Sequence, residues 1–274
     1  MKKKEAMPAL LAAILCVFML AACTDVDTDP NPATGDAGAI TLEFDNIVGD
    51  KNLVLGGGSS TNGAGEDFVL TKFNYYISNI KLLRQDGTYY TVPQDSSYFL
   101  IMEDKKESQL VKLNNVPYAT YTGLEFMVGV DSARNTMPIE KRTGVLDPGG
   151  SMMEDGMYWA WNSGYIFMKM EGTSSKATSA NGKFYYHIGL FGGYDIKTVN
   201  NTRVVKLGFN NLQANVTKDD APEVHIFADV LKFFKGPGTN VSIKEYTSIM
   251  SQQPEKSKEV ADNYAQMFNV DHIH

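Results

Sequence analysis

The stretch FVLTKFNYYISNIKLL at residues 68–83 decides the fold class of this 274-residue chain. It is rich in β-branched and aromatic residues, and such residues favour strands. The turn sequence QDGT follows at residues 85–88 and leads into a second strand-like run at 89–92. Two strand-like runs on either side of a tight turn predict a β-hairpin.

Segments of the same character extend over the rest of the chain from residue 40 onward. Ile40, Leu42 and Phe44 alternate with polar residues, which is the period-two pattern of a half-buried strand. Short strands separated by turn residues predict an antiparallel β-sandwich, so the expected fold class is mainly β. Because no internal repeat and no second shift in composition is present, we expect one domain over residues 40–274. The further strands are expected at residues 52–55, 98–102, 110–113, 121–130, 184–190, 203–209 and 225–230.

The C-terminal segment has a different pattern. Residues 255–268 place Val260, Tyr264 and Phe268 at helical spacing, and Pro254 comes just before them. This pattern predicts an amphipathic helix that packs on the sandwich, and residues 243–250 are a candidate for an additional short helix. The chain then ends in the sequence DHIH at residues 271–274.

The first 22 residues have the pattern of a secretory signal. Lysines at positions 2–4 precede an apolar run at residues 10–20, which is too short to span a bilayer comfortably. The run ends in LAAC at residues 20–23, which resembles a bacterial lipobox. We therefore expect a lipoprotein signal peptide at residues 1–22 and a lipid on Cys23. The alternative is an ordinary signal peptide cleaved after Ala22.

Residues 23–39 predict a flexible tether between the lipid and the domain, since Asp, Pro, Gly and small residues fill them without hydrophobic periodicity. Thr24 stands where an inner-membrane retention signal would have Asp. The expected location is therefore the cell envelope, with the lipid as membrane anchor in the outer membrane. The domain would face either the periplasm or the cell surface.

Composition and motifs exclude several classes of function. A net charge of −7 argues against a nucleic-acid binder, which needs a basic face. The only cysteines are Cys16 and Cys23, so the body of the protein has no disulfide framework and no Cys-based metal site. The chain lacks the Gly-x-Ser-x-Gly motif of hydrolases. The glycine-rich loop at residues 56–67 lacks the Lys of a phosphate-binding loop and is better interpreted as a mobile hairpin loop. We do not expect an enzyme.

The four histidines, His187, His225, His272 and His274, are candidate metal ligands. On an extended backbone, residues two apart project to the same side, so His272 and His274 could bind one copper or zinc ion. The alternative is a terminal tail with solvated histidines. His187 lies in an aromatic strand, where a histidine is usually half-buried and hydrogen-bonded to a neighbour. We interpret His225 as a surface histidine beside an acid.

Several methionines occur around two tryptophans. Thioether sulfur is a soft ligand for Cu(I), but a methionine beside aromatic rings is also an ordinary core residue. Core packing is the stronger interpretation for each methionine taken singly. These residues are Met152, Met153, Met157, Met168 and Met170, with Trp159 and Trp161.

Six phrases occur together in this chain. They are FVLTKFNYYISNIKL (68–82), GVDSARN (129–135), GVLDP (144–148), YWAWNSGYIFMKMEG (158–172), YHIG (186–189) and DHIH (271–274). Together they resemble the MbnP-like domain of bacterial periplasmic lipoproteins, and the version here looks like the Bacteroidetes branch. The resemblance covers about residues 40–274.

The family is named for the copper-binding protein partnered with methanobactin. The resemblance therefore implies a β-sandwich that binds copper through histidines, in the periplasm or at the cell surface. His187 matches the His-Ile/Leu-Gly position of the family, and His272 and His274 match the terminal histidine pair of this branch. Asn46 and Arg134 stand where related sequences often carry histidine, so the family's ligand set is incomplete here.

The resemblance also implies partners. Some members use an oxidised tryptophan as a ligand, and a partner dihaem enzyme makes that residue. An outer-membrane transporter is the other partner that a copper-handling lipoprotein of this family would meet.

The predicted function is a lipid-anchored copper-binding protein involved in copper acquisition or handling. In this hypothesis His187, His272 and His274 meet in one site, with a Met or Asp as a further ligand. One rival is a surface module that binds a glycan or a protein partner without metal. Another is a purely structural lipoprotein in which each histidine is separately hydrogen-bonded. Geometry distinguishes them, because the copper site requires His187 to lie close to the terminal pair.

Overall fold

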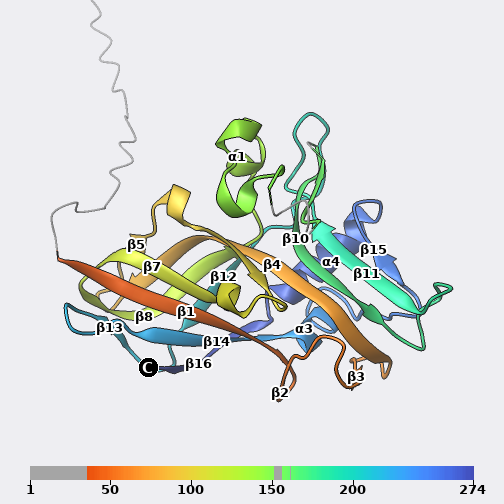
Figure 1. Cartoon of the computed structure of the whole chain (residues 1–274), viewed down its shortest axis with the longest axis horizontal. Coiled ribbons are helices and arrows are strands. Elements are labelled where there is room, and N and C mark those ends of the chain that lie inside the picture. The colour runs from red at the N-terminus through yellow and green to blue at the C-terminus, as the bar shows by residue number, and fades with distance from the viewer. Residues whose placement is uncertain (1–35, 151–155, 161) are drawn as a thin grey trace, which may run out of the picture. The chain divides into compact units, whose positions relative to one another are not determined.

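Two β-sheets that pack around a shared core make up the described part of the chain (Figure 1). The structure is a computed structural model and describes residues 36–150, 156–160 and 162–274. These residues belong to the second of the two units into which the chain divides, residues 31–274. The smaller sheet consists of β1 (Ala37–Val48), β2 (Lys51–Asn52), β7 (Leu110–Pro117), β14 (Glu223–Asp229) and β16 (Phe268–Ile273). Its order is β16-β14-β1-β2, and β7 also pairs with β1.

The larger sheet has eleven strands and is organised by its longest strand, β4 (Asp67–Arg84). The others are β3 (Ser60–Thr61), β5 (Tyr89–Thr91), β6 (Tyr98–Met102), β8 (Ala119–Val128), β9 (Tyr158–Ala160), β10 (Gly164–Thr173), β11 (Lys183–Gly189), β12 (Arg203–Gly208), β13 (Ala214–Val216) and β15 (Ser248–Ile249). β4 pairs with β3, β5, β6, β8 and β10 along its length. The strand predicted at residues 68–83 and its hairpin with β5 are therefore confirmed.

Most neighbouring strands run antiparallel, but β1 with β14 and β11 with β15 run parallel. The predicted β-sandwich is confirmed, and these two pairs are a departure from a purely antiparallel arrangement. The parallel pairing matters for function because it sets Glu43 of β1 directly beside His225 of β14. These two strands keep the same alternation, so their outward positions line up along the sheet.

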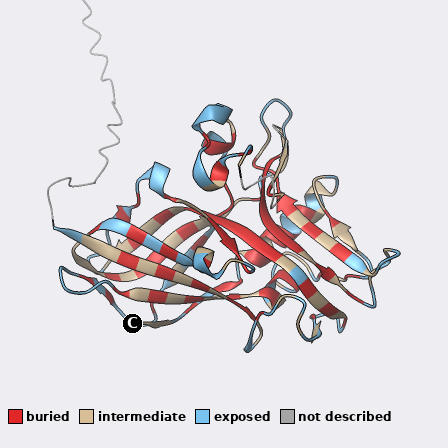
Figure 2. Ribbon diagram, in the orientation of Figure 1, coloured by how far each residue is buried: buried red, intermediate tan, exposed pale blue. Residues whose placement is uncertain are grey.

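The alternation that predicted the first strand is visible as bands of buried and partly buried residues along β1 (Figure 2). Ile40, Leu42 and Phe44 are fully buried in the core between the sheets. The ring of Phe44 lies 5.6 Å from that of Phe126 and 6.3 Å from that of Phe268, measured between centroids. Burying a side chain of this size stabilises the fold by about 1.5–3 kcal/mol. The smaller sheet is thus held by its inward face, and its outward face is free to carry polar groups.

A second, smaller hydrophobic cluster lies on the other side of β4 and includes Tyr76 and Met157. Met168 and Met170 belong to the main core instead. All three methionines are fully buried, so their interpretation as core residues is confirmed. Trp159 packs against the second cluster from a partly buried position. The predictions for Met152, Met153 and Trp161 concern residues outside the described ones.

The helix predicted near the C-terminus is present as α4 (Pro254–Tyr264). It buries Val260 and Tyr264, as the helical spacing indicates. The predicted end at residue 268 is wrong, because Phe268 begins strand β16. Its ring packs into the sandwich core against Phe126 at 5.1 Å between centroids, and this contact requires an extended chain rather than a further helical turn.

The short helix expected at residues 243–250 is wrong. Ile249 lies in β15, which pairs with β11 opposite Tyr186. Just before it, the Glu66 carboxylate accepts hydrogen bonds from the backbone N–H groups of Ile243 and Lys244, at 2.6 and 3.1 Å. These bonds hold the segment in a turn. The other helices and single turns are α1 (Ser132–Asn135), α3 (Val230–Phe234), η1 (Gln94–Ser96), η2 (Lys106–Gln109), η3 (Ile139–Lys141) and η4 (Gly144–Leu146).

β1 begins at Ala37, so the last residues of the predicted tether belong to the sheet, where Ala37 pairs with Pro117 of β7. The predicted signal peptide and the lipid on Cys23 concern residues outside the described ranges and stay predictions. Within those ranges, no helix combines the length and the hydrophobicity that a membrane span requires.

Candidate metal centre

The candidate metal centre lies at the edge of the smaller sheet, where β16 pairs with β14. The register of the two strands shifts by one residue between Val224 and Ile226. As a result, Asp271 and His272 of β16 together lie opposite the single residue His225 of β14. This arrangement is a β-bulge, a feature that re-aims side chains and often occurs at sheet edges and beside functional sites.

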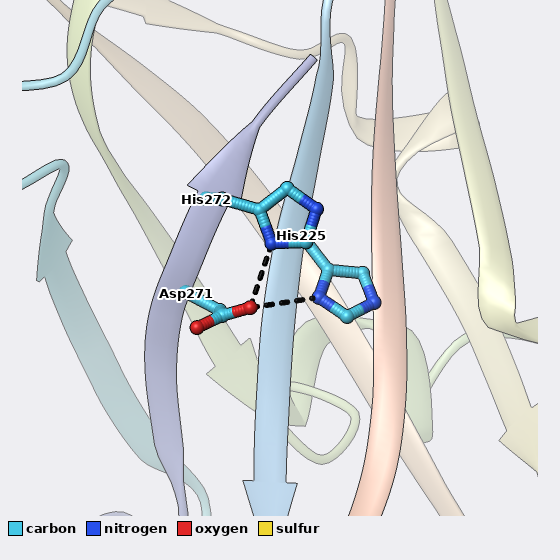
Figure 3. A group of neighbouring side chains, drawn as sticks. All are labelled: His225, Asp271 and His272. Carbon is cyan, nitrogen blue, oxygen red and sulfur yellow. Dashed lines mark hydrogen bonds and ion pairs between the residues drawn. The ribbon is translucent and has the colours of Figure 1, made fainter.

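The bulge determines where the side chains point. Successive side chains of a regular strand point to opposite faces, so Asp271 and His272 would otherwise lie on different sides of the sheet. Here Asp271 Oδ2 lies 2.6 Å from His272 Nδ1 and 3.6 Å from His225 Nδ1 (Figure 3). The rings of His225 and His272 lie 4.6 Å apart between centroids. The three side chains therefore converge on one place.

His225, Asp271 and His272 together make a set of possible metal ligands. One nitrogen or oxygen of each lies within 4.8 Å of the other two, and no other group of three His, Cys, Asp or Glu in the described ranges does so. His225 Nδ1 is buried and has no hydrogen-bond partner. A buried polar atom without a partner costs about 1–3 kcal/mol, and an ion bound there would remove that cost. The donor set therefore fits a divalent ion.

His274 extends this group outward. Its Nε2 lies 2.8 Å from Nε2 of His272, so the two histidines project to the same side, as their spacing predicts. The backbone N–H of His274 donates to the carbonyl of Glu223 at 2.9 Å, and the N–H of Glu223 donates back at 3.1 Å. The terminal residues are thus part of the sheet rather than a solvated tail. We call His225, Asp271, His272 and His274 the C-terminal histidine cluster.

Carboxylates surround His225 on its other side. Its Nε2 lies 3.4 Å from Glu43 Oε2 and 4.0 Å from Asp45 Oδ2, both on β1. Burial raises the pKa of Glu43, the charge of His225 lowers it, and the charge and hydrogen bond of Glu223 raise it again. The net direction is upward, with burial as the largest cause and the neighbouring carboxylates Glu223 and Asp45 as smaller ones. This face of the sheet therefore favours cations.

His187 does not join the C-terminal histidine cluster, so the expectation of one shared site is corrected here. It lies on β11 in the larger sheet, on the opposite side of Figure 1 from the C-terminal end. Its Nε2 lies 2.7 Å from Glu171 Oε1 on the neighbouring strand β10. The hydrogen bond from His187 lowers the pKa of Glu171. His187 is thus a half-buried histidine with its own carboxylate partner.

The two positions that depart from the family pattern also have their own partners. The side-chain N–H of Asn46 donates to Glu103 Oε2 at 2.9 Å, and the hydroxyl of Tyr75 donates to Asn46 Oδ1 at 3.0 Å. The guanidinium of Arg134 pairs with Asp95 at 2.5 Å. Neither residue belongs to the C-terminal histidine cluster.

Sequence reasoning did not group His225 with the terminal residues and interpreted it as a surface histidine beside an acid. The residue is indeed beside acids, but it also faces Asp271 and His272. The usable signal was its outward position between the buried residues Val224 and Ile226, combined with the polar end of the chain. The missing information was that the last strand pairs with this one.

A family model, MbnP, matches residues 37–251 of the chain. This chain belongs to the MbnP family. The family resemblance inferred from the sequence phrases is therefore confirmed. In this MbnP-family chain, His187 and His225 lie within the matched range, whereas Asp271, His272 and His274 lie beyond it. The cluster thus joins one residue of the family domain to a strand that the family model does not include.

A solved structure, MbnP from Methylosinus trichosporium, is similar to this MbnP-family chain, with a TM-score of 0.51 and 16% sequence identity. The similarity covers 75% of this chain and 83% of that one. At this level of identity the likeness supports a shared fold and nothing finer. A search of curated proteins found no match.

Proposed function

We propose that this MbnP-family protein binds a divalent copper ion at the C-terminal histidine cluster. The observation that carries the proposal is the convergence of His225, Asp271 and His272, whose donor atoms lie within 4.8 Å of one another. The buried Nδ1 of His225, which has no hydrogen-bond partner, supports the same conclusion. The ligand set proposed here differs from the one predicted from the sequence, because His225 and Asp271 take the place of His187 beside the terminal histidines.

The chemistry of the donors indicates the kind of ion. Two imidazole nitrogens and a carboxylate oxygen are borderline to hard ligands, and the cluster contains no sulfur. Such a set favours Cu(II) over Cu(I), and the Irving–Williams order places Cu(II) above Zn(II) at the same ligands. The carboxylates of Glu43 and Asp45 add negative charge beside the site, which strengthens the attraction for a dication.

The chain's own residues would hold the ion without large rearrangement. His225 is fixed in a strand with neighbours on both sides, β1 and β16. Asp271 Oδ2 already lies 2.6 Å from His272 Nδ1, so these two donor atoms are side by side before an ion binds. Backbone bonds between His274 and Glu223 fix the end of β16. A site built on paired strands keeps its ligands in place better than a site on loops.

The wider role that we propose is copper acquisition or handling in the cell envelope, with binding rather than catalysis as the activity. The signal-like residues 1–22 and the lipobox at Cys23 support a lipid anchor in the outer membrane. An outer-membrane transporter or a dihaem enzyme is the partner class that the family resemblance suggests.

A glycan-binding surface has less support. Such a surface presents exposed aromatic rings together, and among the described residues the exposed large aromatics are Tyr89 and Tyr194. They lie on separate elements, in β5 and in the segment after β11. The metal-binding function is therefore the better supported of the two.

The test is a Cu(II) titration of residues 24–274, prepared without a histidine tag, which would itself bind copper. This chain keeps every described residue and the whole of the compact unit 31–274. We expect the unchanged chain to bind one Cu(II) ion tightly, and we expect His225→Ala to lose this tight binding. The matched control is His187→Ala, which removes a half-buried histidine from the other sheet and should keep that tight binding. Equal binding by His225→Ala and the unchanged chain would refute the proposal.

A further inference from the structure

Each of the two ring nitrogens of His272 lies close to an atom of another side chain that can itself bind a metal ion. Its Nδ1 lies 2.6 Å from Asp271 Oδ2, and its Nε2 lies 2.8 Å from Nε2 of His274. The lone pairs of the two ring nitrogens point in divergent directions, so a single ion cannot use both. The rings of His225, His272 and His274 form a row, with centroids 4.6 and 4.4 Å apart.

We propose that the C-terminal histidine cluster holds two divalent ions that share His272 as a ligand. This inference rests on the proposed copper-binding function. The inner position uses Nδ1 of His272 with His225 and Asp271. The outer position uses Nε2 of His272 with Nε2 of His274, and water completes its coordination.

The outer pair has the spacing that a copper ion requires. Two nitrogens at right angles on one ion, each about 2.0 Å from it, lie about 2.8 Å apart. The two Nε2 atoms have this separation already. The tetragonal geometry of Cu(II) places neighbouring ligands at such angles. The pair is also fixed, because β16 is bonded to β14 through His274 and Glu223.

The charge on this face suits two dications. Glu43, Asp45 and Asp271 lie within 4.0 Å of His225, and Glu223 lies close enough for its charge to raise the pKa of Glu43. When all four carboxylates are ionised, their negative charge equals the positive charge of two copper ions. When the second ion binds, it takes the place of the remaining ring proton of His272, and that proton passes to solvent. His272 then bridges the two ions as an imidazolate.

The two positions differ in exposure, and this predicts different affinities. The side chain of His225 is 14% exposed, whereas that of His272 is 43% exposed and His274 is an exposed residue. The inner position also has a carboxylate ligand, which the outer one lacks. We therefore expect the inner ion to bind at least about tenfold more tightly than the outer one.

The experiment combines stoichiometry with electron paramagnetic resonance on residues 24–274. We expect two Cu(II) equivalents in the unchanged chain and one in His274→Ala, which removes the outer position. His225→Ala should keep only the weak equivalent, and His272→Ala should bind neither ion tightly. The control His187→Ala should keep both.

Spin coupling tests the shared ligand. The Cu(II) signal should rise with the first equivalent and fall as the second is added, because two copper ions bridged by one imidazolate couple antiferromagnetically. In His274→Ala the signal should stay at the level of one uncoupled ion. If two Cu(II) ions bind and their resonance signals simply add, the two ions do not share His272 as a bridging ligand, and this part of the proposal is overturned. One equivalent in the unchanged chain, unaffected by His274→Ala, would overturn the second position and leave the proposed function intact. No copper at all would overturn the proposed function itself.

Discussion

His225 of β14 and His272 of β16 face each other with their ring centroids 4.6 Å apart, because a bulge in β16 turns two consecutive side chains toward β14. The position of His225 depends in turn on the parallel pairing of β14 with β1, which adds Glu43 on its other side. The candidate metal centre is therefore a product of two strand pairings between segments that are far apart in the sequence.

Replacing the carboxylate of the cluster should weaken metal binding without affecting the fold. Asp271→Asn keeps the size of the side chain but removes the negative charge and the anionic donor. Asp271 is exposed, so the free energy of unfolding should change by less than about 0.5 kcal/mol. The affinity for the first copper ion should fall about 10- to 100-fold in a competition titration. Asp195→Asn, at an exposed position in the segment after β11 of the larger sheet, is the control and should bind as the unchanged chain does.

Deleting residues 271–274 should abolish tight copper binding and leave the domain folded. The deleted residues form the outer end of β16, so the domain should lose the pair of backbone bonds with Glu223 and the packing of the partly buried Ile273 on the core, together about 2–3 kcal/mol in unfolding. Phe268→Ala should cost more, about 3–5 kcal/mol, because Phe268 packs in the core. Thermal unfolding of both variants gives the comparison. A deletion variant that unfolds more easily than Phe268→Ala would contradict this account of β16.

The pair formed by His187 and Glu171 should act on stability alone. His187→Ala leaves a half-buried carboxylate without its hydrogen bond, so the free energy of unfolding should fall by about 1–2 kcal/mol. Because the pair lies in the other sheet, copper stoichiometry should not change. Denaturant unfolding and a copper titration on the same preparation check both expectations. A loss of copper in this variant would restore His187 as a ligand.

Glu66 should make stability depend on pH in a defined direction. Burial raises its pKa, but hydrogen bonds from Asn62, Ile243, Ser242 and Lys244 outweigh this and lower the pKa below its ordinary value of 4.5. A lowered folded-state pKa means that the carboxylate stabilises the fold above about pH 4.5, and that this contribution is lost as the pH falls through the folded-state pKa.

Glu66→Gln should therefore reduce the free energy of unfolding at pH 7 by about 1–3 kcal/mol and flatten the loss of stability between about pH 5 and pH 3. Urea unfolding across this range provides the measurement. Glu140→Gln, at an exposed position of η3, is the control. Its free energy of unfolding should fall with decreasing pH as steeply as that of the unchanged chain. An equally steep loss of stability with falling pH in Glu66→Gln and in the unchanged chain would show that the turn at Ile243 does not depend on the carboxylate.

Much of the fold could be predicted because local patterns decide it. The alternation at Ile40, Leu42 and Phe44 and the β-rich run at 68–83 identify strands without knowledge of their partners. The helix at α4 follows from apolar spacing in the same way. Its end could not be predicted, because Phe268 also fits the apolar face of a helix. Only its contact with the core ring of Phe126 assigns it to a strand.

The site could be predicted only in part, for a similar reason. The geometry of His272 and His274 follows from their spacing on an extended chain, and the structure confirms it. The participation of His225 and Asp271 depends on which strands pair and on a one-residue bulge, and neither leaves a local signal. Family resemblance favoured His187, but that residue faces Glu171 on a different sheet.

The most direct test of the central claim is an anomalous-difference map from crystals of residues 24–274 grown with copper and measured at the copper absorption edge. The account predicts the strongest peak between His225, Asp271 and His272, with a weaker one beside His274. A strongest peak at His187, or near Arg134 with none at the C-terminal strand, would contradict it.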